Sequence, residues 1–229
     1  MKIHWKLMCC LLPLVLLGVG CKKGSDAKQN ATTSATTPVP ANTSGPAGSA
    51  SSPEAGVLAA ETTAKLAGAE WAMKQDEIKN DPHGQWAIQA TASSSYNDAQ
   101  GTAAWSANQV TGAPNVEKYA DDGAAWAPKT PDAGIEWLDL KYSKPVHATE
   151  VRVRESCGSG AVVKIELLDE QGGAHLAWGG NDPATELNYL IVKFPKTAFK
   201  TARVKVTLAT NVVSGWNEID AVQLVGTDQ

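Results

Sequence analysis

The feature that most constrains the fold is the segment Gly134 to Glu155, GIEWLDLKYSKPVHATEVRVRE, where apolar and polar residues alternate in two runs around a Ser-Lys-Pro break. Val151 and Val153 share one side of an extended chain, whereas Arg152 and Arg154 share the other. Successive side chains of a β-strand point to opposite faces, so this alternation is typical of strands with one buried and one solvated face. The segment predicts a pair of half-buried strands.

Further runs of this kind continue toward the C-terminus, and no helical pattern separates them. The expected strands are 86–93, 135–142, 147–155, 161–169, 174–178, 187–194, 202–209 and 218–225. The Glu-Gln-Gly-Gly sequence at 170–173 is typical of the turn of a hairpin. Eight short strands without intervening helices predict an all-β domain over residues 85–229, built as a two-sheet β-sandwich.

The N-terminus, residues 1–20, has the composition of a signal peptide. Lys2 and Lys6 precede an apolar stretch at 7–19, which is shorter than the roughly 20 residues that a membrane-spanning helix needs. A glycine directly before Cys21 resembles the lipobox of bacterial lipoproteins, which implies acylation of Cys21. The expected location is therefore the bacterial cell envelope, with the protein lipid-anchored and outer-membrane, periplasmic or surface-facing. Ordinary cleavage and secretion is the alternative.

Two segments are expected between the signal peptide and the strands. Residues 21–56 are rich in Ser, Thr, Ala and Pro, with Val39 as the one large aliphatic residue, so they predict a disordered linker. Residues 57–80 are rich in Ala, Glu, Lys and Leu and predict a stalk helix. Trp71 and Ile78 lie seven residues apart, which favours packing of this helix on the sandwich. Helical oligomerisation is the alternative.

Charge and cysteine content exclude several classes of function. Removal of the signal peptide leaves 18 basic against 24 acidic residues, a net charge of about −6. This balance argues against nucleic acid and anionic lipid as the main partner. Cys9 and Cys10 leave with the signal peptide, and an acylated Cys21 leaves Cys157 as the one remaining thiol. The domain therefore has to fold without an internal disulfide.

Five motifs, taken in their order along the chain, resemble a known family. They are TASSSYN at 91–97, WSANQVTGAPNV at 105–116, DDGAAWAP at 121–128, EWLDLKY with VHATEVRVRE at 136–155, and GWNEIDAVQLVG at 215–226. Together they resemble a bacterial branch of the discoidin, or coagulation-factor type C, galactose-binding-like domains, over about 140 residues. The resemblance implies an eight-stranded jelly-roll β-sandwich. It also implies non-enzymatic binding of carbohydrate, phospholipid headgroup or protein through loops at one end of the sandwich.

Tryptophan is unusually frequent, with eight Trp against two Phe, and flat indole rings either fill cores or stack on sugar rings. Three tryptophans adjoin predicted strands and are expected in the core: Trp86, Trp137 and Trp216. Others lie in long loops or at the end of a hairpin strand. The candidate ligand-binding residues are Trp105, Asn108, Trp126 and Trp178. Anchoring of their loops is the alternative role for these tryptophans.

Asp121, Asp122 and Glu218 are candidate ligands of a structural calcium ion. In the resembled family such an ion is held near these loops by backbone carbonyls and one or two carboxylates, and calcium takes six to eight oxygen ligands. The alternative is that Asp121 and Asp122 are turn residues and that Glu218 hydrogen-bonds a neighbouring loop. No group of His and Cys has the spacing of a zinc site.

No catalytic residue is predicted. His83, His147 and His175 are scattered, no Ser lies in a G-x-S-x-G context, and nothing fixes a separation between Glu218 and Asp121 that would suit a hydrolase. The sequence therefore predicts a non-enzymatic binding module of a lipid-anchored envelope protein, with carbohydrate or an envelope protein as its partner. The alternative is a protein–protein interaction scaffold with no sugar site. The ligand and the oligomeric state stay open.

Overall fold

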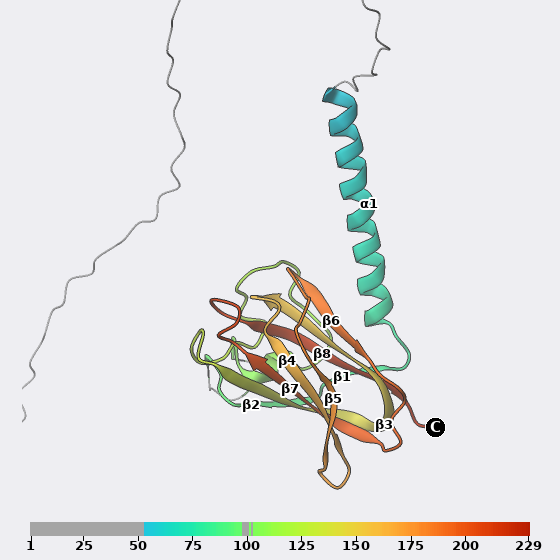
Figure 1. Cartoon of the computed structure of the whole chain (residues 1–229), viewed down its shortest axis with the longest axis vertical. Coiled ribbons are helices and arrows are strands. Elements are labelled where there is room, and N and C mark those ends of the chain that lie inside the picture. The colour runs from blue at the N-terminus through green and yellow to red at the C-terminus, as the bar shows by residue number, and fades with distance from the viewer. Residues whose placement is uncertain (1–52, 98–100, 102) are drawn as a thin grey trace, which may run out of the picture. The chain divides into compact units, whose positions relative to one another are not determined.

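Antiparallel β-strands are the main regular structure of the computed structural model, which describes residues 53–97, 101 and 103–229 (Figure 1). The chain divides into two units, Met1–Ala50 and Ser51–Gln229, and every described residue belongs to the second. The predicted signal peptide, Cys21 and nearly all of the predicted linker therefore lie outside the described residues.

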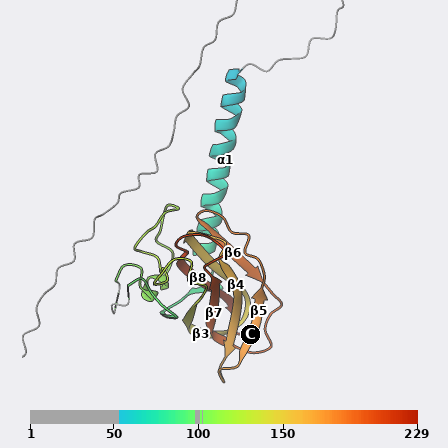
Figure 2. The same ribbon diagram turned by 60° about the vertical axis from the view of Figure 1, so that its left-hand side comes forward.

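Eight strands form two layers that share one strand (Figures 1 and 2). The strands are β1 (Gly84–Trp86), β2 (Gln89–Ala92), β3 (Ile135–Cys157), β4 (Val162–Asp169), β5 (Ala174–Gly179), β6 (Asn188–Lys193), β7 (Thr201–Ala209) and β8 (Glu218–Thr227). One layer has the order β1-β8-β3-β6, and the other has the order β2-β3-β7-β4-β5. This is the eight-stranded all-β sandwich that the alternating pattern and the family resemblance predict, and it is open at its edges.

The long strand β3 corrects the prediction of two paired strands at 135–142 and 147–155. Its first part pairs with β2 and β7 in one layer, and its second part pairs with β6 and β8 in the other. The two runs are therefore one strand of 23 residues that crosses between the layers. The register shifts between Lys141 and Val146, where Pro145 has no N–H to donate to a ladder.

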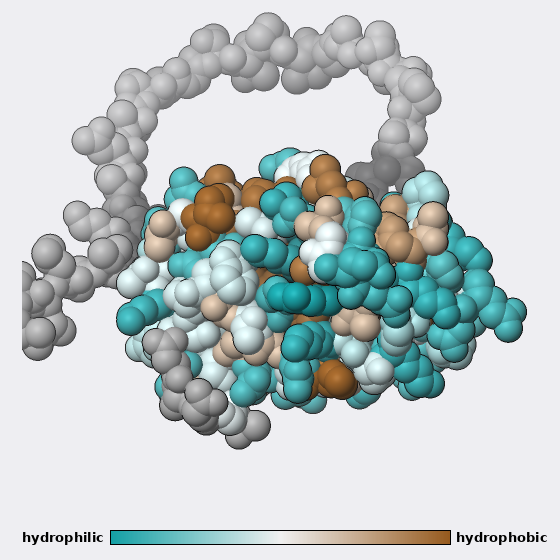
Figure 3. Space-filling view, turned by 90° about the horizontal axis from the view of Figure 1, so that it is seen from below, coloured by the Kyte–Doolittle hydropathy of each residue, from teal (hydrophilic) through white to brown (hydrophobic). Residues whose placement is uncertain are grey.

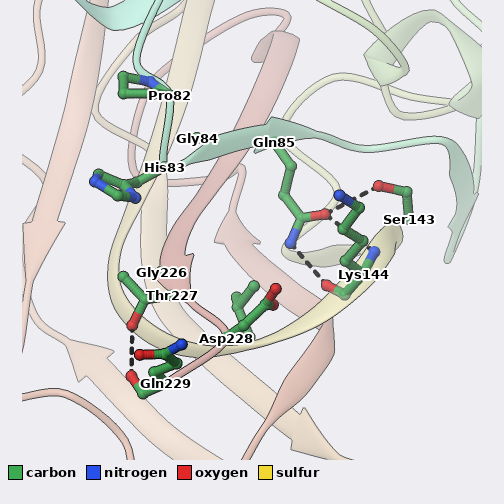
Figure 4. Close-up of a pocket in the computed structure, with 11 residues that line it drawn as sticks. Pro82, His83, Gly84, Gln85, Ser143, Lys144, Gly226, Thr227, Asp228 and Gln229 are labelled. Atoms are coloured by element: carbon green, nitrogen blue, oxygen red, sulfur yellow. Dashed lines mark hydrogen bonds between the residues drawn. The ribbon is translucent and has the colours of Figure 1, made fainter.

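The predicted strand 86–93 is likewise two short strands, β1 and β2, which belong to different layers. Near the point where β1 and β2 separate, the side chain of Gln85 forms hydrogen bonds with β3 where that strand crosses between the layers (Figure 4). Its Nε2 donates to the carbonyl of Lys144 at 2.8 Å, and its Oε1 accepts from Lys144 N at 3.1 Å and Ser143 Oγ at 3.2 Å. A side-chain amide thus replaces a missing strand neighbour.

The core lies between the two layers and consists of the inward residues of the predicted strands. Thirteen valine, leucine and isoleucine side chains of the strands are at most 1% exposed: Leu138, Leu140, Val151, Val153, Val162, Ile165, Leu167, Val204, Val206, Leu208, Ile219, Val222 and Leu224. Each fully buried side chain of this size contributes about 1.5 to 3 kcal/mol. The alternation therefore supplies the driving force for closing one layer on the other without any disulfide.

The helix α1 (Pro53–Lys79) precedes the sandwich, and only its last turns contact it. Ile78 is buried, and its carbonyl accepts a hydrogen bond of 2.9 Å from Gln223 Nε2. The indole of Trp71 lies 5.7 Å from the guanidinium carbon of Arg154. Figure 1 shows the rest of the helix extending away from the strands. Ile78 is thus packed on the sandwich as predicted, whereas Trp71 contacts Arg154 but remains 39% exposed.

The face of the molecule seen in Figure 3 is mostly hydrophilic. Hydrophobic residues appear on it as separate patches, so this face offers no continuous apolar area of the kind that marks a large interface. Within the described residues, no helix is both long enough and apolar enough to cross a lipid bilayer.

Candidate functional site

Three aromatic side chains from three separate loops meet at the N-terminal end of β8. Tyr96 lies edge to face with Trp105, with 5.4 Å between ring centroids and 71° between planes, and with Trp216 at 5.3 Å and 88°. Such perpendicular pairs place the positive edge of one ring against the negative face of another. We call the cavity of about 110 Å³ between them the aromatic pocket; its lining is Tyr96, Trp105, Asp121, Ala127, Trp216 and Glu218.

Trp126 does not line the aromatic pocket, and its side chain is fully buried. The expectation that it stacks on a ligand is corrected by this burial. Its Nε1 instead donates to the carbonyl of Ser94 at 3.0 Å and to Ser95 Oγ at 3.2 Å. The next residue, Tyr96, donates its backbone N–H to Ala127 O at 2.9 Å. Trp126 therefore anchors the loop that presents Tyr96.

Trp105, one of the candidate ligand residues, lines the pocket, and its backbone has an uncommon conformation. Its φ of 56° lies in the left-handed region, where bulky residues are strained. Two hydrogen bonds hold it there: its backbone N–H donates to Gly123 O at 3.0 Å, and its Nε1 donates to Asp121 Oδ1 at 2.9 Å. A side chain at Gly123 would lie 2.9 Å from the Cβ of Ala104, so this close approach requires glycine.

Glu218, the first residue of β8, forms the acidic floor of the aromatic pocket. The residue is 1% exposed, and its Oε2 accepts a hydrogen bond of 3.1 Å from Asp122 N. Its Oε1 receives no hydrogen bond from any donor in the described part of the chain. Burial, together with the neighbouring carboxyl groups of Asp121 and Asp122, raises the pKa of Glu218 to about 8 against the opposing effect of that backbone bond. Glu218 is therefore mostly protonated at pH 7.

The side chains of the three predicted calcium ligands are not gathered into one cluster. Asp121 and Glu218 share the aromatic pocket, whereas Asp122 Oδ1 accepts a hydrogen bond of 2.9 Å from Ala124 N within its own turn. The remaining wall is aromatic and supplies few of the six to eight oxygens that calcium takes. In the described ranges, no group of three or more His, Cys, Asp or Glu side chains is placed to hold a metal ion.

Asn108 and Trp178, the other predicted ligand residues, lie outside the aromatic pocket. Asn108 belongs to the short 3-10 helix η1 (Ala107–Val110), and its Nδ2 donates to Gly101 O at 2.9 Å, so it stabilises its own loop. Trp178 lies in β5 and packs half-buried against the main core. Sequence reasoning missed Tyr96 and placed Trp216 in the core. The sequence indication that Trp216 lies in a loop was the preceding Gly215. The structure gives that glycine a φ of 96°.

Larger hollows exist but are less suited to specific binding. One of about 530 Å³ lies at the other end of β8 and is drawn in Figure 4. Its polar side chains are largely engaged already: Gln85 bonds to the crossover, and Thr227 Oγ1 donates to Gln229 O at 2.8 Å. Two others, of about 560 and 480 Å³, border the last turns of α1. The aromatic pocket is thus the candidate site that best combines ring surface with an unsatisfied polar atom.

Comparison with known sequences gives one family match. Residues 75–229, which include the end of α1 and the whole sandwich, match the family described as "Pappalysin-1, SD scarf domain, C-terminal". A search of the curated proteins finds no match.

Solved structures with a similar arrangement include modules and a larger enzyme. Chitosan-binding module 1 of a chitosanase/glucanase from Paenibacillus sp. IK-5 aligns with a TM-score of 0.45 and 13% identity, covering 60% of this chain and 94% of the module. CpGH89CBM32-5 from Clostridium perfringens, in complex with GalNAc-beta-1,3-galactose, aligns with a TM-score of 0.46 and 14% identity. The alignment covers 60% of this chain and 94% of that chain. A GH29 fucosidase from Ruminococcus gnavus aligns at 0.46 and 11%, covering 66% of this chain and 26% of the fucosidase.

Proposed function

We propose that this chain, which belongs to the family of the pappalysin-1 C-terminal SD scarf domain, is a non-catalytic carbohydrate-binding module of a lipid-anchored cell-envelope protein. The observation that supports the proposal is the aromatic pocket, in which rings from three loops surround two carboxyl groups. Indole and phenol rings contact the apolar surfaces of sugars, and carboxylates accept hydrogen bonds from hydroxyl groups. The site would hold its ligand and perform no turnover.

Replacing Trp216 with alanine is expected to weaken glycan binding about tenfold or more, because one of the three contacting rings is lost. Binding of the purified full chain to a glycan array, followed by titration of the best glycan, measures the effect. Trp137→Ala is the matched control, since Trp137 lies outside the pocket. The centroid of its ring is 4.7 Å from Lys205 Nζ. Equal weakening by both substitutions would count against the pocket as the binding site.

A second candidate function, a scaffold for partner proteins, is favoured by aliphatic side chains on α1. Val57, Leu58, Leu66 and Met73 are between 59% and 64% exposed, and burial of such groups in a partner would stabilise a complex. The array separates the two candidates when it is combined with a pull-down from envelope extracts. Absence of any bound glycan, together with one defined protein whose capture is lost in Leu66→Ser, would replace carbohydrate binding with the scaffold function.

Cys21→Ser is expected to release the protein from membranes, because the proposed anchor is a lipid on that thiol. Cys21 lies outside the described residues, so the proposal depends on the sequence around it. Fractionation of cells and labelling with a fatty-acid analogue measure the effect, and Cys157→Ser is the matched control. Membrane association that persists in Cys21→Ser would remove the anchor from the proposal.

A further inference from the structure

The shape of the aromatic pocket suits a compact group better than a flat ring. Tyr96 stands at 71° to Trp105 and at 88° to Trp216, so the three rings that line this cavity differ in orientation and do not form a flat platform. The cavity of about 110 Å³ is well below the roughly 300 to 1,000 Å³ of pockets that enclose whole small ligands. One small substituent of a larger ligand fills it.

The charge of the lining selects the kind of substituent. Two of the six lining residues, Asp121 and Glu218, carry carboxyl groups, and none of the six is basic. Aromatic faces also attract cations, and several rings that line one cavity are the usual arrangement for holding an ammonium group. The aromatic rings and the carboxyl groups of this pocket therefore both favour a positively charged ligand group.

When Glu218 is ionised, the polar floor of the pocket lacks a hydrogen-bond donor for its Oε1, whereas the protonated acid carries its own O–H beside Asp121. Glu218 is 1% exposed, and its Oε1 has no donor among the described residues. Asp121 lies beside it, but its Oδ1 already accepts from Trp105 Nε1, and a carboxylate has no proton to offer. An ionised Glu218 is thus buried without compensation, which is unfavourable unless a cation or a proton arrives. An ammonium group supplies both the charge and the N–H donor.

We infer that the aromatic pocket binds a protonated amine and, resting on the proposed carbohydrate-binding function, that its ligand is an amino sugar with a free amine. The sugar ring lies outside the cavity, and the ammonium group lies inside it between the three rings. Asp121 is held toward this position by Trp105 Nε1, and Glu218 supplies the acceptor at the floor.

Binding of a cation is coupled to release of a proton from Glu218. Burial raises the pKa of this carboxyl group to about 8, and a neighbouring cation favours its ionised form. The other titratable groups that face Glu218 are Asp121 and Asp122 from the adjoining loop and Cys157, its partner across from β3. Affinity for a permanent cation is therefore expected to rise with pH through about 8.

The test compares three probes by calorimetric titration of the full chain: a glucosamine trisaccharide, its fully N-acetylated counterpart, and tetramethylammonium. The free-amine trisaccharide is expected to bind about tenfold or more tightly than the acetylated one, and Glu218→Gln, which keeps the side-chain shape, is expected to remove this preference. Affinity for tetramethylammonium is expected to rise about tenfold or more between pH 6 and pH 9. Glu170→Gln, in the exposed hairpin turn, is the control, and Trp216→Ala gives a second variant should Glu218→Gln fold poorly.

The outcomes separate this inference from the proposed function. Equal binding of the two trisaccharides overturns the inference and leaves carbohydrate binding in place. Binding of tetramethylammonium alone supports the ammonium pocket and overturns the amino-sugar assignment, while the glycan array decides on carbohydrate binding. Absence of binding by all three probes overturns the inference outright. A rise in melting temperature with calcium that is lost in Glu218→Gln would make the pocket a metal site and overturn the inference as well.

Discussion

Replacing Arg154 with alanine is expected to lower the free energy of unfolding by about 3 to 5 kcal/mol. Arg154 is 4% exposed, and its Nε donates to Asp220 Oδ2 at 3.1 Å while a terminal nitrogen donates to Val116 O at 3.1 Å. Its guanidinium carbon also lies 5.2 Å from the ring of Tyr189. Removal of the guanidinium leaves the buried carboxylate of Asp220 without its counter-charge, which is the main source of the loss.

Urea denaturation followed by circular dichroism measures this effect, and Arg203→Ala is its matched control. Arg203 also forms a two-bond pair with a carboxylate, Asp139, at 2.6 Å for each bond. Its side chain is 44% exposed, so loss of the pair is expected to cost less than about 1 kcal/mol. Similar losses in the two variants would show that burial of Arg154 contributes little to stability.

Unfolding free energy is expected to fall by several kcal/mol as pH rises from about 5 to 9. Burial raises the pKa of Glu155 to about 9, and neighbouring Asp182 adds to the shift. A carboxyl group with a raised pKa in the folded state keeps a proton that the unfolded chain releases above its ordinary pKa of 4.5. The folded state binds more protons across this interval, so stability decreases through it. Glu218, with a pKa raised to about 8, acts in the same direction.

Glu155→Gln tests the origin of this pH dependence, because the amide keeps the shape of the protonated acid and carries no charge. Gly160 N donates to Glu155 Oε2 at 2.8 Å, and the amide oxygen can accept this bond. Thermal melts at pH 5, 7 and 9 are expected to show a flatter pH profile in this variant and greater stability than the natural protein at pH 9. Glu170→Gln serves as the exposed control. A slope unchanged by Glu155→Gln would assign the effect to other groups.

The strands β4 and β7 were predictable because their side chains alternate, whereas β8 is buried along nearly its whole length. What alternation could not show is which strands pair. The Ser-Lys-Pro sequence in β3 is typical of a turn, yet the chain continues extended because Gln85, far away in sequence, satisfies the backbone groups at Lys144. A tertiary contact thus overrides a local signal.

The candidate site was predictable only in part, for a related reason. Trp105, Asp121 and Glu218 were found because their residue types point to binding or metal chemistry. Trp126 and Trp216 exchange the roles expected for them, since flanking residues do not show whether an indole points into the core or outward. Trp126 is buried because its backbone pairs with Ile219 at the start of β8, a contact that depends on the folded loop.

The sharing of β3 by both layers affects how the domain responds to heat. Where two sheets are joined by loops alone, one sheet can fray while the other persists. Here the melting of either sheet removes hydrogen-bonded neighbours from β3. The amide groups in both halves of β3 therefore lose their protection from hydrogen exchange together. The slowest-exchanging amides on the two sides of Pro145 should therefore report one common opening energy, that of global unfolding.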